Sequence, residues 1–439
     1  MIDSHELRRR DSYLNKLIGF QDTEPVKVIT GIRRCGKSSL LKLMVQHLKD
    51  TGVLPEQIIE MNFESFDFHK MSADDVYRYV KERIITGKRV YLFFDELQRI
   101  KAWEDAVNAF RVDFDCDIYV TGSNAYLLSS EYATYLSGRC VEIKMLPLSF
   151  REFLDFHGFD VRETQSAFGG LRKQVFDKNN ERYELREVFA AYMRFGGMPG
   201  IADVGLEQEK VLALLDGIYS TVVIRDILER ETRRGQKQIT DPALLRKIIL
   251  FLADNIGSSV SIASIGNTLV NEGLWDDGKR KGTPSAHTVQ AYVNALLESY
   301  FFYEIKRFDI KGKAYLRTLG KYYIVDIGLR NYLLGFRNRD SGHAIENVVY
   351  FELLRRGYDV AIGKIGNAEV YFITTTADEK KYIQVTESMM SEDVRKRELA
   401  PLQSIRDNYE KIVLSLEPGL DTSYDGIKSE NLIDWLLNE

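Results

Sequence analysis

Short runs of β-branched and aromatic residues alternate with amphipathic stretches over the first 150 residues of the chain. The runs that predict strands cover residues 26–30, 57–62, 89–94, 117–121 and 141–146. Strands separated by helical patterns are typical of a parallel sheet whose connections are helices. Residues 1–148 are therefore expected to form an α/β domain.

The pattern changes three times beyond this domain. Residues 149–238 show helical periodicity, broken by a Gly-Gly-Met-Pro-Gly turn, which predicts a helical lid or bundle. Residues 239–338 predict three short helices and then a β-rich run with Lys-Gly-Lys at its centre, as in a hairpin. Residues 339–439 predict a helix, several strands, a helix and a strand. The whole chain is expected to be a multidomain α/β protein.

Composition excludes several classes of protein. The chain has 439 residues, 44% hydrophobic and 28% charged, and its 8 Pro and 31 Gly do not fit collagen-like or Pro-rich disordered chains. Three cysteines without a Cys-x-x-Cys pair and six scattered histidines support neither disulfides nor a zinc site. The N-terminus lacks the apolar run of a secretory signal, and no run of about 18 apolar residues occurs. A cytoplasmic protein without membrane contact is expected.

A phosphate-loop pattern, GIRRCGKS, follows the first predicted strand and precedes a helical pattern. Gly31 and Gly36 allow backbone N–H groups to approach phosphates, and the helix start adds partial positive charge. Lys37 would pair with the β and γ phosphates, and the Ser38 hydroxyl would ligate Mg²⁺. ATP and Mg²⁺ are therefore the expected cofactors. The residues expected to bind the nucleotide are Gly31, Ile32, Arg33, Arg34, Cys35, Gly36, Lys37, Ser38 and Ser39.

An acidic pair ends the apolar run VYLFFDEL at residues 90–97. A buried parallel strand brings its last side chains to the carboxyl edge of the sheet, beside the phosphate loop. Asp95 is expected to bind Mg²⁺ through water, and Glu96 to act as general base on the attacking water. The alternative is that both are a solvated turn.

Polar residues also end the next predicted strand, DIYVTGSN. Thr121, Ser123 and Asn124 are candidates to orient the water or to sense the γ-phosphate, and the alternative is that they only form a turn. No Asn-Lys-x-Asp motif follows the sheet, so guanine specificity lacks support.

Three arginines have open roles. Arg139 is a candidate transition-state arginine, acting in its own chain or from a neighbouring subunit, or else an ordinary surface residue. The long side chains of Arg33 and Arg34 must point away from the phosphates. They are expected to contact a neighbouring subunit, nucleic acid or solvent.

Positive charge is concentrated in one segment. Residues 225–340 contain 19 Lys and Arg against 13 Asp and Glu, so the local net charge is +6 within a chain of -5. The same segment predicts a winged helix-turn-helix, with residues 285–299 as recognition helix and 301–317 as wing. Double-stranded DNA is therefore a candidate partner, although winged helices also dock proteins. The residues expected to meet phosphates are Lys279, Arg280, Lys281, Lys306, Arg307, Lys311, Lys313 and Arg317.

Several motifs in order give the chain a family resemblance. GIRRCGKSSLL, FFDELQRI, TGSN, SGRCVEIKMLPLSFREFL, FGGMPG, KYYIVDIGLR and GHAIENVVYFELLRRGYDV resemble the prokaryotic ATP-binding proteins that join an AAA-type ATPase domain to a DUF4143 region. In that family the C-terminal region is similar to a PD-(D/E)XK nuclease core. The resemblance implies a P-loop ATPase followed by a nuclease-like domain.

The nuclease residues are incomplete. Such a core needs a helix Glu, a strand acidic residue and a Glu-x-Lys pair, so that both strand groups aim at one Mg²⁺. Glu346 matches the first, but Tyr371, Gln384 and Thr386 occupy the other positions. The nearby acidic residues, Glu369 and Glu387, do not restore the spacing. An inactive nuclease fold is expected, with Glu346 as a structural carboxylate.

Taken together, the motifs predict an Mg²⁺-dependent ATPase. Hydrolysis would drive rearrangement of modules that bind DNA or a protein partner, and the protein is a candidate homo-oligomer. The alternatives are an ATP-dependent nuclease and a slow nucleotide-gated switch that binds another protein.

Overall fold

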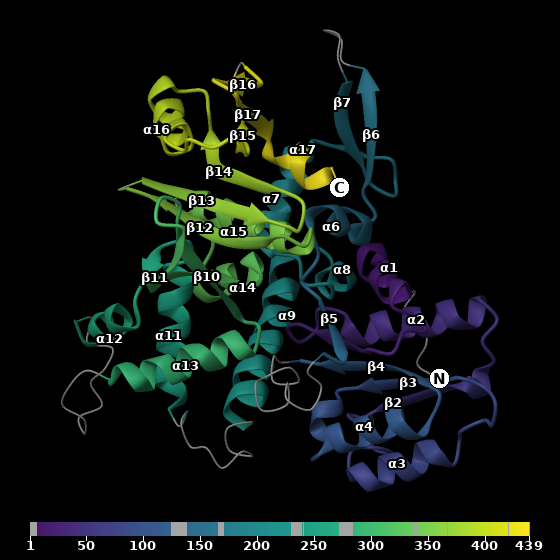
Figure 1. Ribbon diagram of the computed structural model, residues 1–439. Coiled ribbons are helices and arrows are strands. Elements are labelled where there is room, and N and C mark those ends of the chain that lie inside the picture. Colours follow the sequence, from purple (N-terminus) through teal and green to yellow (C-terminus); the bar gives the residue numbers. More distant parts are fainter. Residues whose placement is uncertain are drawn as a thin grey trace. The chain divides into compact units, whose positions relative to one another are not determined.

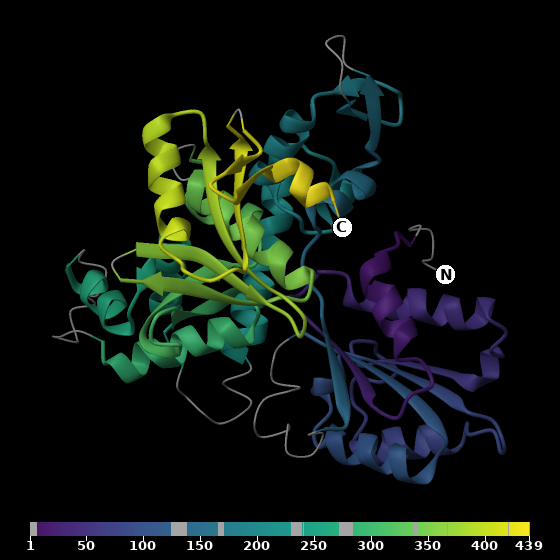
Figure 2. The ribbon, with the colours of Figure 1, turned by 45° about the horizontal axis from the view of Figure 1, so that its top comes forward.

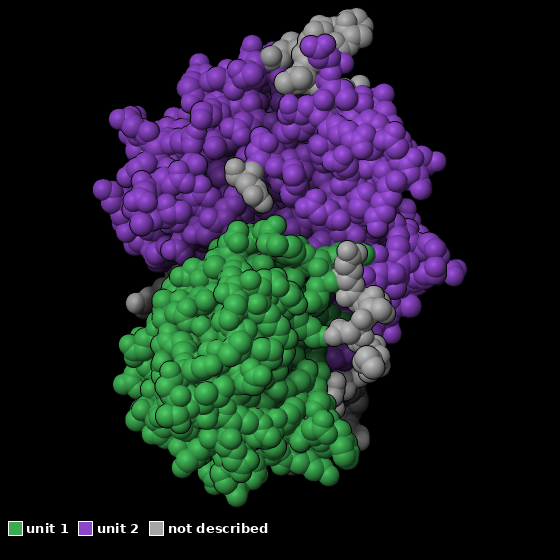
Figure 3. All heavy atoms as spheres, turned by 90° about the vertical axis from the view of Figure 1, so that its right-hand side faces the viewer, with its two compact units in different colours: residues 1–146, 298–300 green, residues 147–297, 301–439 purple. Residues whose placement is uncertain are grey.

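The chain divides into two compact units, shown in different colours in Figure 3. Unit 1 comprises Met1–Leu146 and Glu298–Tyr300, and unit 2 comprises Pro147–Leu297 and Phe301–Glu439. The computed structural model describes residues 7–123, 138–165, 171–229, 239, 241–271, 284–337, 341–366, 368–419 and 421–438.

Unit 1 contains a five-stranded parallel sheet in the order β2-β3-β4-β1-β5 (Figure 1). All five strands predicted from the sequence are present. The strands are β1 (Val26–Thr30), β2 (Ile58–Asn62), β3 (Val90–Asp95), β4 (Cys116–Gly122) and β5 (Cys140–Lys144). The described helices are α1 (Asp11–Gly19), α2 (Lys37–Asp50), α3 (Ala73–Lys81) and α4 (Trp103–Asp113), with 3₁₀ turns at Pro55–Gln57 and Leu97–Arg99.

Helices cover both faces of this sheet (Figures 1 and 2). Side chains of α3 and α4, among them Val80 and Phe110, form one buried cluster with Phe94 of β3 and Val120 of β4. Near-continuous burial of β1, β3 and β4 explains why their sequences are apolar runs without polar alternation.

A buried ion pair joins two neighbouring strands of unit 1. Lys27 Nζ on β1 donates to Asp117 on β4, and both side chains are fully buried. Asp117 also accepts the Tyr119 hydroxyl at 2.9 Å and the Asp22 N–H at 2.8 Å. Burial lowers the pKa of Lys27, and the Asp117 carboxylate opposes that shift. The pair is satisfied by hydrogen bonds on both sides, as buried charges require.

Unit 2 is built on a nine-stranded mixed sheet in the order β16-β17-β15-β14-β13-β12-β10-β11-β9, and a three-stranded antiparallel sheet β6-β7-β8. Its strands are β6 (Asp160–Gln165), β7 (Leu171–Phe176), β8 (Arg182–Tyr183), β9 (Ser259–Val260), β10 (Phe302–Asp309), β11 (Ala314–Ile324), β12 (Asp359–Ile365), β13 (Ala368–Thr375), β14 (Lys380–Ser388), β15 (Glu410–Glu417), β16 (Ser423–Tyr424) and β17 (Ile427–Asn431). Its described helices are α6 (Phe150–His157), α7 (Leu185–Phe195), α8 (Ile201–Val204), α9 (Gln208–Ser220), the π-helical segment Thr221–Glu229, α11 (Pro242–Asp254), α12 (Ile262–Asn271), α13 (Ala286–Glu298), α14 (Ile327–Leu334), α15 (Ser341–Arg355), α16 (Glu392–Gln403) and α17 (Leu432–Leu437).

The small sheet corrects the helical prediction for residues 149–238. Helices α6, α7 and α9 are present, but strands β6 to β8 lie between α6 and α7. Strand β6 has the sequence DVRETQ and exposes most of its side chains. An exposed strand has no apolar alternation, and this is why hydrophobic periodicity carried no strand signal.

The segment predicted as a winged helix has the predicted order of elements. Helices α11, α12 and α13 precede the antiparallel pair β10 and β11, and β9 pairs with β11. Ser285 opens α13, because its Oγ accepts the Thr288 N–H at 3.0 Å. Strand β10 also pairs in parallel with β12, so residues on both sides of the predicted boundary at 338 belong to one sheet.

The predicted turn at residues 196–200 is confirmed, and it contacts a distant segment of unit 2. The Gly197 N–H donates to Asp326 at 2.6 Å, and Asp326 also caps α14 by accepting the Leu329 N–H at 3.1 Å. Burial raises the pKa of Asp326 to about 6, although these N–H groups favour its ionised form. Within the described residues, no helix has the length and apolarity needed to cross a membrane.

Candidate nucleotide-binding site

The phosphate-loop residues connect the end of β1 to the start of α2. Gly31 has φ 140°, and a Cβ at this position would lie 2.1 Å from the Met145 carbonyl oxygen. Gly36 has φ 103° and is the N-cap of α2. No other residue type fits the position of Gly31, and the loop leaves the first N–H groups of α2 at its end, where anions bind.

Lys37 lies under the loop and is 5% exposed. Its Nζ donates to the carbonyl oxygens of Gly31 at 2.9 Å and Ile32 at 3.1 Å. The ammonium group is therefore held among the backbone atoms that would surround a phosphate.

Asp95, at the end of β3, accepts hydrogen bonds from three elements. Ser38 Oγ donates to Asp95 Oδ1 at 3.0 Å, Asn62 Nδ2 donates to Oδ2 at 3.0 Å, and the Thr121 hydroxyl donates to Oδ1. The carboxylate is 8% exposed. The sequence predicted that Ser38, Asp95 and Thr121 belong to one site, and the structure brings them together. Asn62 was not predicted from the sequence. Its only indication there is its position as the last residue of β2, at the same edge of the sheet.

Glu96 is the next residue, 7% exposed, with a left-handed φ of 57°. Its N–H donates to Thr121 Oγ1 at 3.0 Å, while its carboxylate accepts from Gln98 Nε2 at 2.5 Å and from Ser123 Oγ at 3.4 Å. Burial raises the pKa of Glu96, and the positive charges of Lys37 and Arg33 oppose this shift. The turn therefore presents a buried carboxylate of raised basicity beside Lys37.

Arg33 and Arg34 occupy different environments. The Arg33 guanidinium lies 3.3 Å from Glu64 and 4.0 Å from Glu96, with its side chain 14% exposed. Arg34 is exposed and has φ 63°. The contacts expected for Arg33 were a neighbouring subunit, nucleic acid or solvent. In the structure, its guanidinium lies instead beside two carboxylates of its own unit, Glu64 and Glu96.

Of the other two predicted catalytic residues, only Arg139 lies within the described part of the chain. Asn124 lies outside the described residues. Arg139 is exposed, and its carbonyl accepts the Val26 N–H at the start of β1. The phosphate loop begins at the other end of this five-residue strand, about 16 Å away at 3.3 Å per residue. The Arg139 backbone therefore lies at the opposite end of β1 from the phosphate loop.

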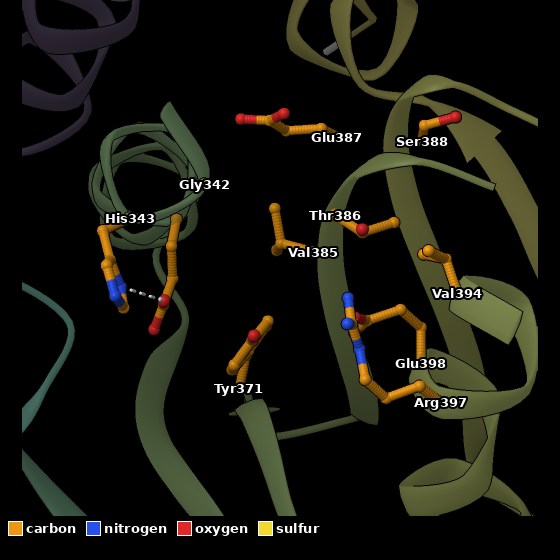
Figure 4. A pocket seen from close by; sticks show the side chains of 11 residues that line it. Gly342, His343, Tyr371, Val385, Thr386, Glu387, Ser388, Val394, Arg397 and Glu398 are labelled. Carbon is orange, nitrogen blue, oxygen red and sulfur yellow. Dashed lines mark hydrogen bonds and ion pairs between the residues drawn. The ribbon is translucent and has the colours of Figure 1, made fainter. Parts of the chain in front are cut away.

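A pocket in unit 2 is lined by Glu346, Tyr371 and Thr386, three of the positions compared with a nuclease core (Figure 4). Its volume is about 440 Å³, and its lining residues are Gly342, His343, Glu346, Tyr371, Val385, Thr386, Glu387, Ser388, Val394, Arg397 and Glu398. Glu346 projects from α15 and is 2% exposed; it accepts the Tyr323 hydroxyl and lies 3.5 Å from His343 Nδ1.

A buried lysine lies between two glutamates of this region. Lys321 Nζ on β11 is 3.2 Å from Glu346 and 2.5 Å from Glu369. Lys321, His343 and the Tyr323 hydroxyl hold the pKa of Glu346 below its usual value against the effect of burial. Gln384 donates to Glu398 at 3.2 Å and accepts the Tyr371 N–H at 3.2 Å. In the parts of the chain that the structure describes, no group of three His, Cys, Asp or Glu residues could hold a metal ion.

The basic residues of the predicted wing are partly exposed. Lys306, Lys311 and Lys313 lie on the surface of the β10–β11 hairpin, whereas Lys321 is buried. Lys279, Arg280, Lys281 and the side chain of Arg317 lie outside the part of the chain that the structure describes.

Comparison with known proteins agrees with the site geometry. The family model of an AAA domain matches residues 23–154, and that of a domain of unknown function, DUF8612, matches residues 186–340. The expected AAA-type domain is thus confirmed, while the expected DUF4143 region is not confirmed, because DUF8612 is the second match.

The chain is also similar to two relatives over nearly its full length. An uncharacterized protein of Haemophilus influenzae is 39% identical over 98% of both chains, and one of Methanocaldococcus jannaschii is 30% identical over 95% of this chain and 85% of its own. A Walker-type ATPase of Pyrococcus abyssi has 16% identity and a TM-score of 0.47, covering 74% of this chain and 95% of that one. The chain belongs to the family of these two full-length relatives, and its first unit is an AAA-type P-loop ATPase.

Proposed function

We propose that unit 1 binds ATP with Mg²⁺ and hydrolyses it, with Ser38 and Asp95 holding the cation. The observation that carries this proposal is the 3.0 Å contact between Ser38 Oγ and Asp95 Oδ1 at the end of the phosphate loop. Hydroxyl and carboxylate oxygens are the ligands that Mg²⁺ prefers, so these residues fit the ion. When bound, Mg²⁺ would neutralise charge on the phosphate oxygens.

Glu96 is the proposed general base. Its buried carboxylate accepts hydrogen bonds from Gln98 and Ser123; burial raises its pKa, and Lys37 and Arg33 oppose that rise. A carboxylate of raised pKa beside the phosphate loop accepts a proton from water more readily than an exposed one. Lys37 would hold the phosphates while Glu96 orients the attacking water.

The magnesium assignment can be tested with Asp95→Asn, because an amide keeps the size of the side chain and removes its charge. The dependence of ATP turnover on Mg²⁺ concentration should move to about tenfold higher Mg²⁺ or disappear. Asp105→Asn, at an exposed position on α4, is the control and should match the wild type. A wild-type Mg²⁺ profile for Asp95→Asn would remove this residue from the cation site.

We further propose that hydrolysis drives rearrangement of unit 2 on duplex DNA. The support is the order of elements from α11 to β11, which matches a winged helix, and the exposed Lys306, Lys311 and Lys313 on its hairpin. Adding duplex DNA to the wild-type protein should raise the ATP turnover rate and give salt-sensitive binding. An unchanged rate without salt-sensitive binding would favour a protein partner as the bound molecule.

The nuclease-like pocket is proposed to be inactive. The support is the order α15, β12, β13, β14, α16 and β15, combined with Tyr371, Gln384 and Thr386 at the catalytic positions. Lys321 also fills the space between Glu346 and Glu369 with an ammonium group. Plasmid DNA should stay intact with Mg²⁺ or Mn²⁺ and ATP. Cleavage that disappears in Glu346→Ala would show instead an ATP-dependent nuclease.

A further inference from the structure

Three residues from the second half of the chain belong to unit 1. Glu298–Tyr300 are part of unit 1, whereas Leu297 in α13 and Phe301 before β10 belong to unit 2. The short segment therefore comprises the end of the predicted recognition helix and the residue before the predicted wing, and it belongs to the same compact unit as the ATPase residues.

Tyr300 is the best-anchored residue of this segment. It is 4% exposed, and its hydroxyl donates to Glu142 Oε1 on β5 at 3.2 Å. Burial raises the pKa of Tyr300, so the hydroxyl stays protonated and able to donate. Its φ of 57° lies in the left-handed region, which an aromatic residue adopts only where its surroundings hold it.

Glu142 connects Tyr300 to the start of the phosphate loop. The Thr30 hydroxyl donates to the same oxygen, Glu142 Oε1, and Thr30 is fully buried at the end of β1. The Thr30 carbonyl accepts the Met145 N–H at 2.7 Å, and Met145 in turn faces Gly31. Glu142 Oε1 thus accepts hydrogen bonds both from Thr30, the residue before Gly31, and from Tyr300, which lies between α13 and β10.

The Gly31 carbonyl is hydrogen-bonded to Lys37. Lys37 Nζ donates to the carbonyls of Gly31 and Ile32, and the same ammonium is the group that β and γ phosphates attract. A bound phosphate would therefore compete with the Gly31 carbonyl for the Lys37 ammonium, and Gly31 is the residue next to Thr30. A change at the nucleotide can pass through a short series of bonded groups: Lys37, Gly31, Thr30, Glu142 and Tyr300.

We propose that Tyr300 is the positioning residue through which the nucleotide site controls the junction between α13 and the β10–β11 hairpin. This inference rests on the proposed function, since it requires that ATP binding rearranges unit 2. Tyr300 touches no substrate in this scheme; it acts through Glu142 and Thr30.

The test compares Tyr300→Phe with Tyr322→Phe. Tyr322 is a matched control because its hydroxyl also donates to a glutamate, Glu304, at 3.2 Å, but within the hairpin of unit 2. Both changes remove one hydroxyl and keep the ring. Amide hydrogen exchange in α13 and in β10 is measured for each protein, without nucleotide and with a saturating non-hydrolysable ATP analogue and Mg²⁺.

In the wild type and in Tyr322→Phe, the analogue should change exchange rates in these elements by about fivefold or more. In Tyr300→Phe that difference should fall below about twofold although the analogue is bound. A merely structural role would alter exchange equally with and without nucleotide. If Tyr300→Phe keeps the wild-type difference, the inference is wrong.

Two further results keep the outcomes distinct. A wild-type protein that binds the analogue without any change in α13 or β10 would contradict the proposed rearrangement itself. Should Tyr300→Phe fold poorly, Glu142→Met breaks the same connection from the other side, because Met keeps about the length of the side chain and has no oxygen to accept the Tyr300 and Thr30 hydroxyls. Glu142→Met should also lose the nucleotide-dependent difference, and retention of that difference would overturn the inference.

Discussion

Ser38 Oγ lies 3.0 Å from Asp95 Oδ1, although the two residues are 57 positions apart in the chain. The contact arises because α2 begins, and β3 ends, at the same edge of a parallel sheet. Asn62 and Thr121 hold the Asp95 carboxylate from the neighbouring strands, so its orientation is fixed before any ligand binds. A preorganised carboxylate needs little rearrangement to receive a cation.

The pH dependence of turnover should report the charge beside Glu96. The carboxylate must be ionised to accept a proton, and burial raises its pKa, so activity should fall with decreasing pH at a higher pH than an ordinary glutamate would give. Arg33 lowers this pKa. Arg33→Ala should therefore move the acidic limb of the pH–rate profile to higher pH.

Arg99→Ala is the control for this experiment. Arg99 lies 3.3 Å from Glu64, the other carboxylate that Arg33 contacts, so its removal disturbs the same neighbour through a different side chain. The acidic limb of the pH–rate profile of Arg99→Ala should coincide with that of the wild type. An equal shift in both variants would mean that Glu64, rather than the charge next to Glu96, controls the profile.

Gly31→Ala should abolish nucleotide binding. The added Cβ would lie 2.1 Å from the Met145 carbonyl oxygen, and backbone atoms on both sides would have to move. Gly52→Ala separates this clash from backbone strain, because Gly52 also has positive φ, 95°, but no atom lies within 4 Å of its added Cβ. Binding of a fluorescent ATP analogue should disappear in Gly31→Ala and persist in Gly52→Ala. Loss of binding in both variants would mean that the clash with Met145 does not explain the loss in Gly31→Ala.

Lys27→Met should destabilise unit 1 strongly. The change leaves the Asp117 carboxylate buried and without its cation, which typically costs about 3–5 kcal/mol. Urea unfolding followed by circular dichroism measures the destabilisation. Lys42→Met, on the exposed side of α2, should change stability by less than about 0.5 kcal/mol. A Lys27→Met protein as stable as the wild type would show that the pair contributes little.

Replacing Lys306, Lys311 and Lys313 by Gln should weaken binding to duplex DNA. Removal of one lysine that neutralises a phosphate lowers the steepness of log affinity against log salt by about 0.9, so removal of all three should lower it by nearly 3. Lys396 and Lys428, also exposed in unit 2, provide the control substitutions. Fluorescence anisotropy at several salt concentrations is the measurement, and an unchanged slope would place the DNA interface elsewhere or exclude it.

The sequence predicted the ATPase core well because its signals are local. Apolar runs mark β1, β3 and β4, and the Gly31, Gly36, Lys37 and Ser38 pattern follows directly from phosphate chemistry. Exposed strand β6 carried no such signal. Contacts across the sheet could not be predicted either, since nothing near Asn62 or Lys27 in the chain indicates the partners Asp95 and Asp117.

Unit 2 shows the same limit at longer range. The Gly-rich turn and the segment around Asp326 both stand out as motifs, but only the fold shows that Gly197 donates to Asp326. The missing nuclease carboxylates were visible in the sequence. The ammonium that lies between Glu346 and Glu369 was not, because Lys321 belongs to residues 239–338, which were predicted to form a different domain.

The most direct test of the proposed mechanism is ATP hydrolysis by Glu96→Gln, with Glu104→Gln as control. Glu104 is a buried glutamate on α4 whose pKa is also raised by burial. In Glu96→Gln, ATP binding should persist while turnover falls by about 10²–10⁴-fold, and Glu104→Gln should hydrolyse ATP like the wild type. Wild-type turnover in Glu96→Gln would contradict the assignment of Glu96 as the base and the mechanism built on it.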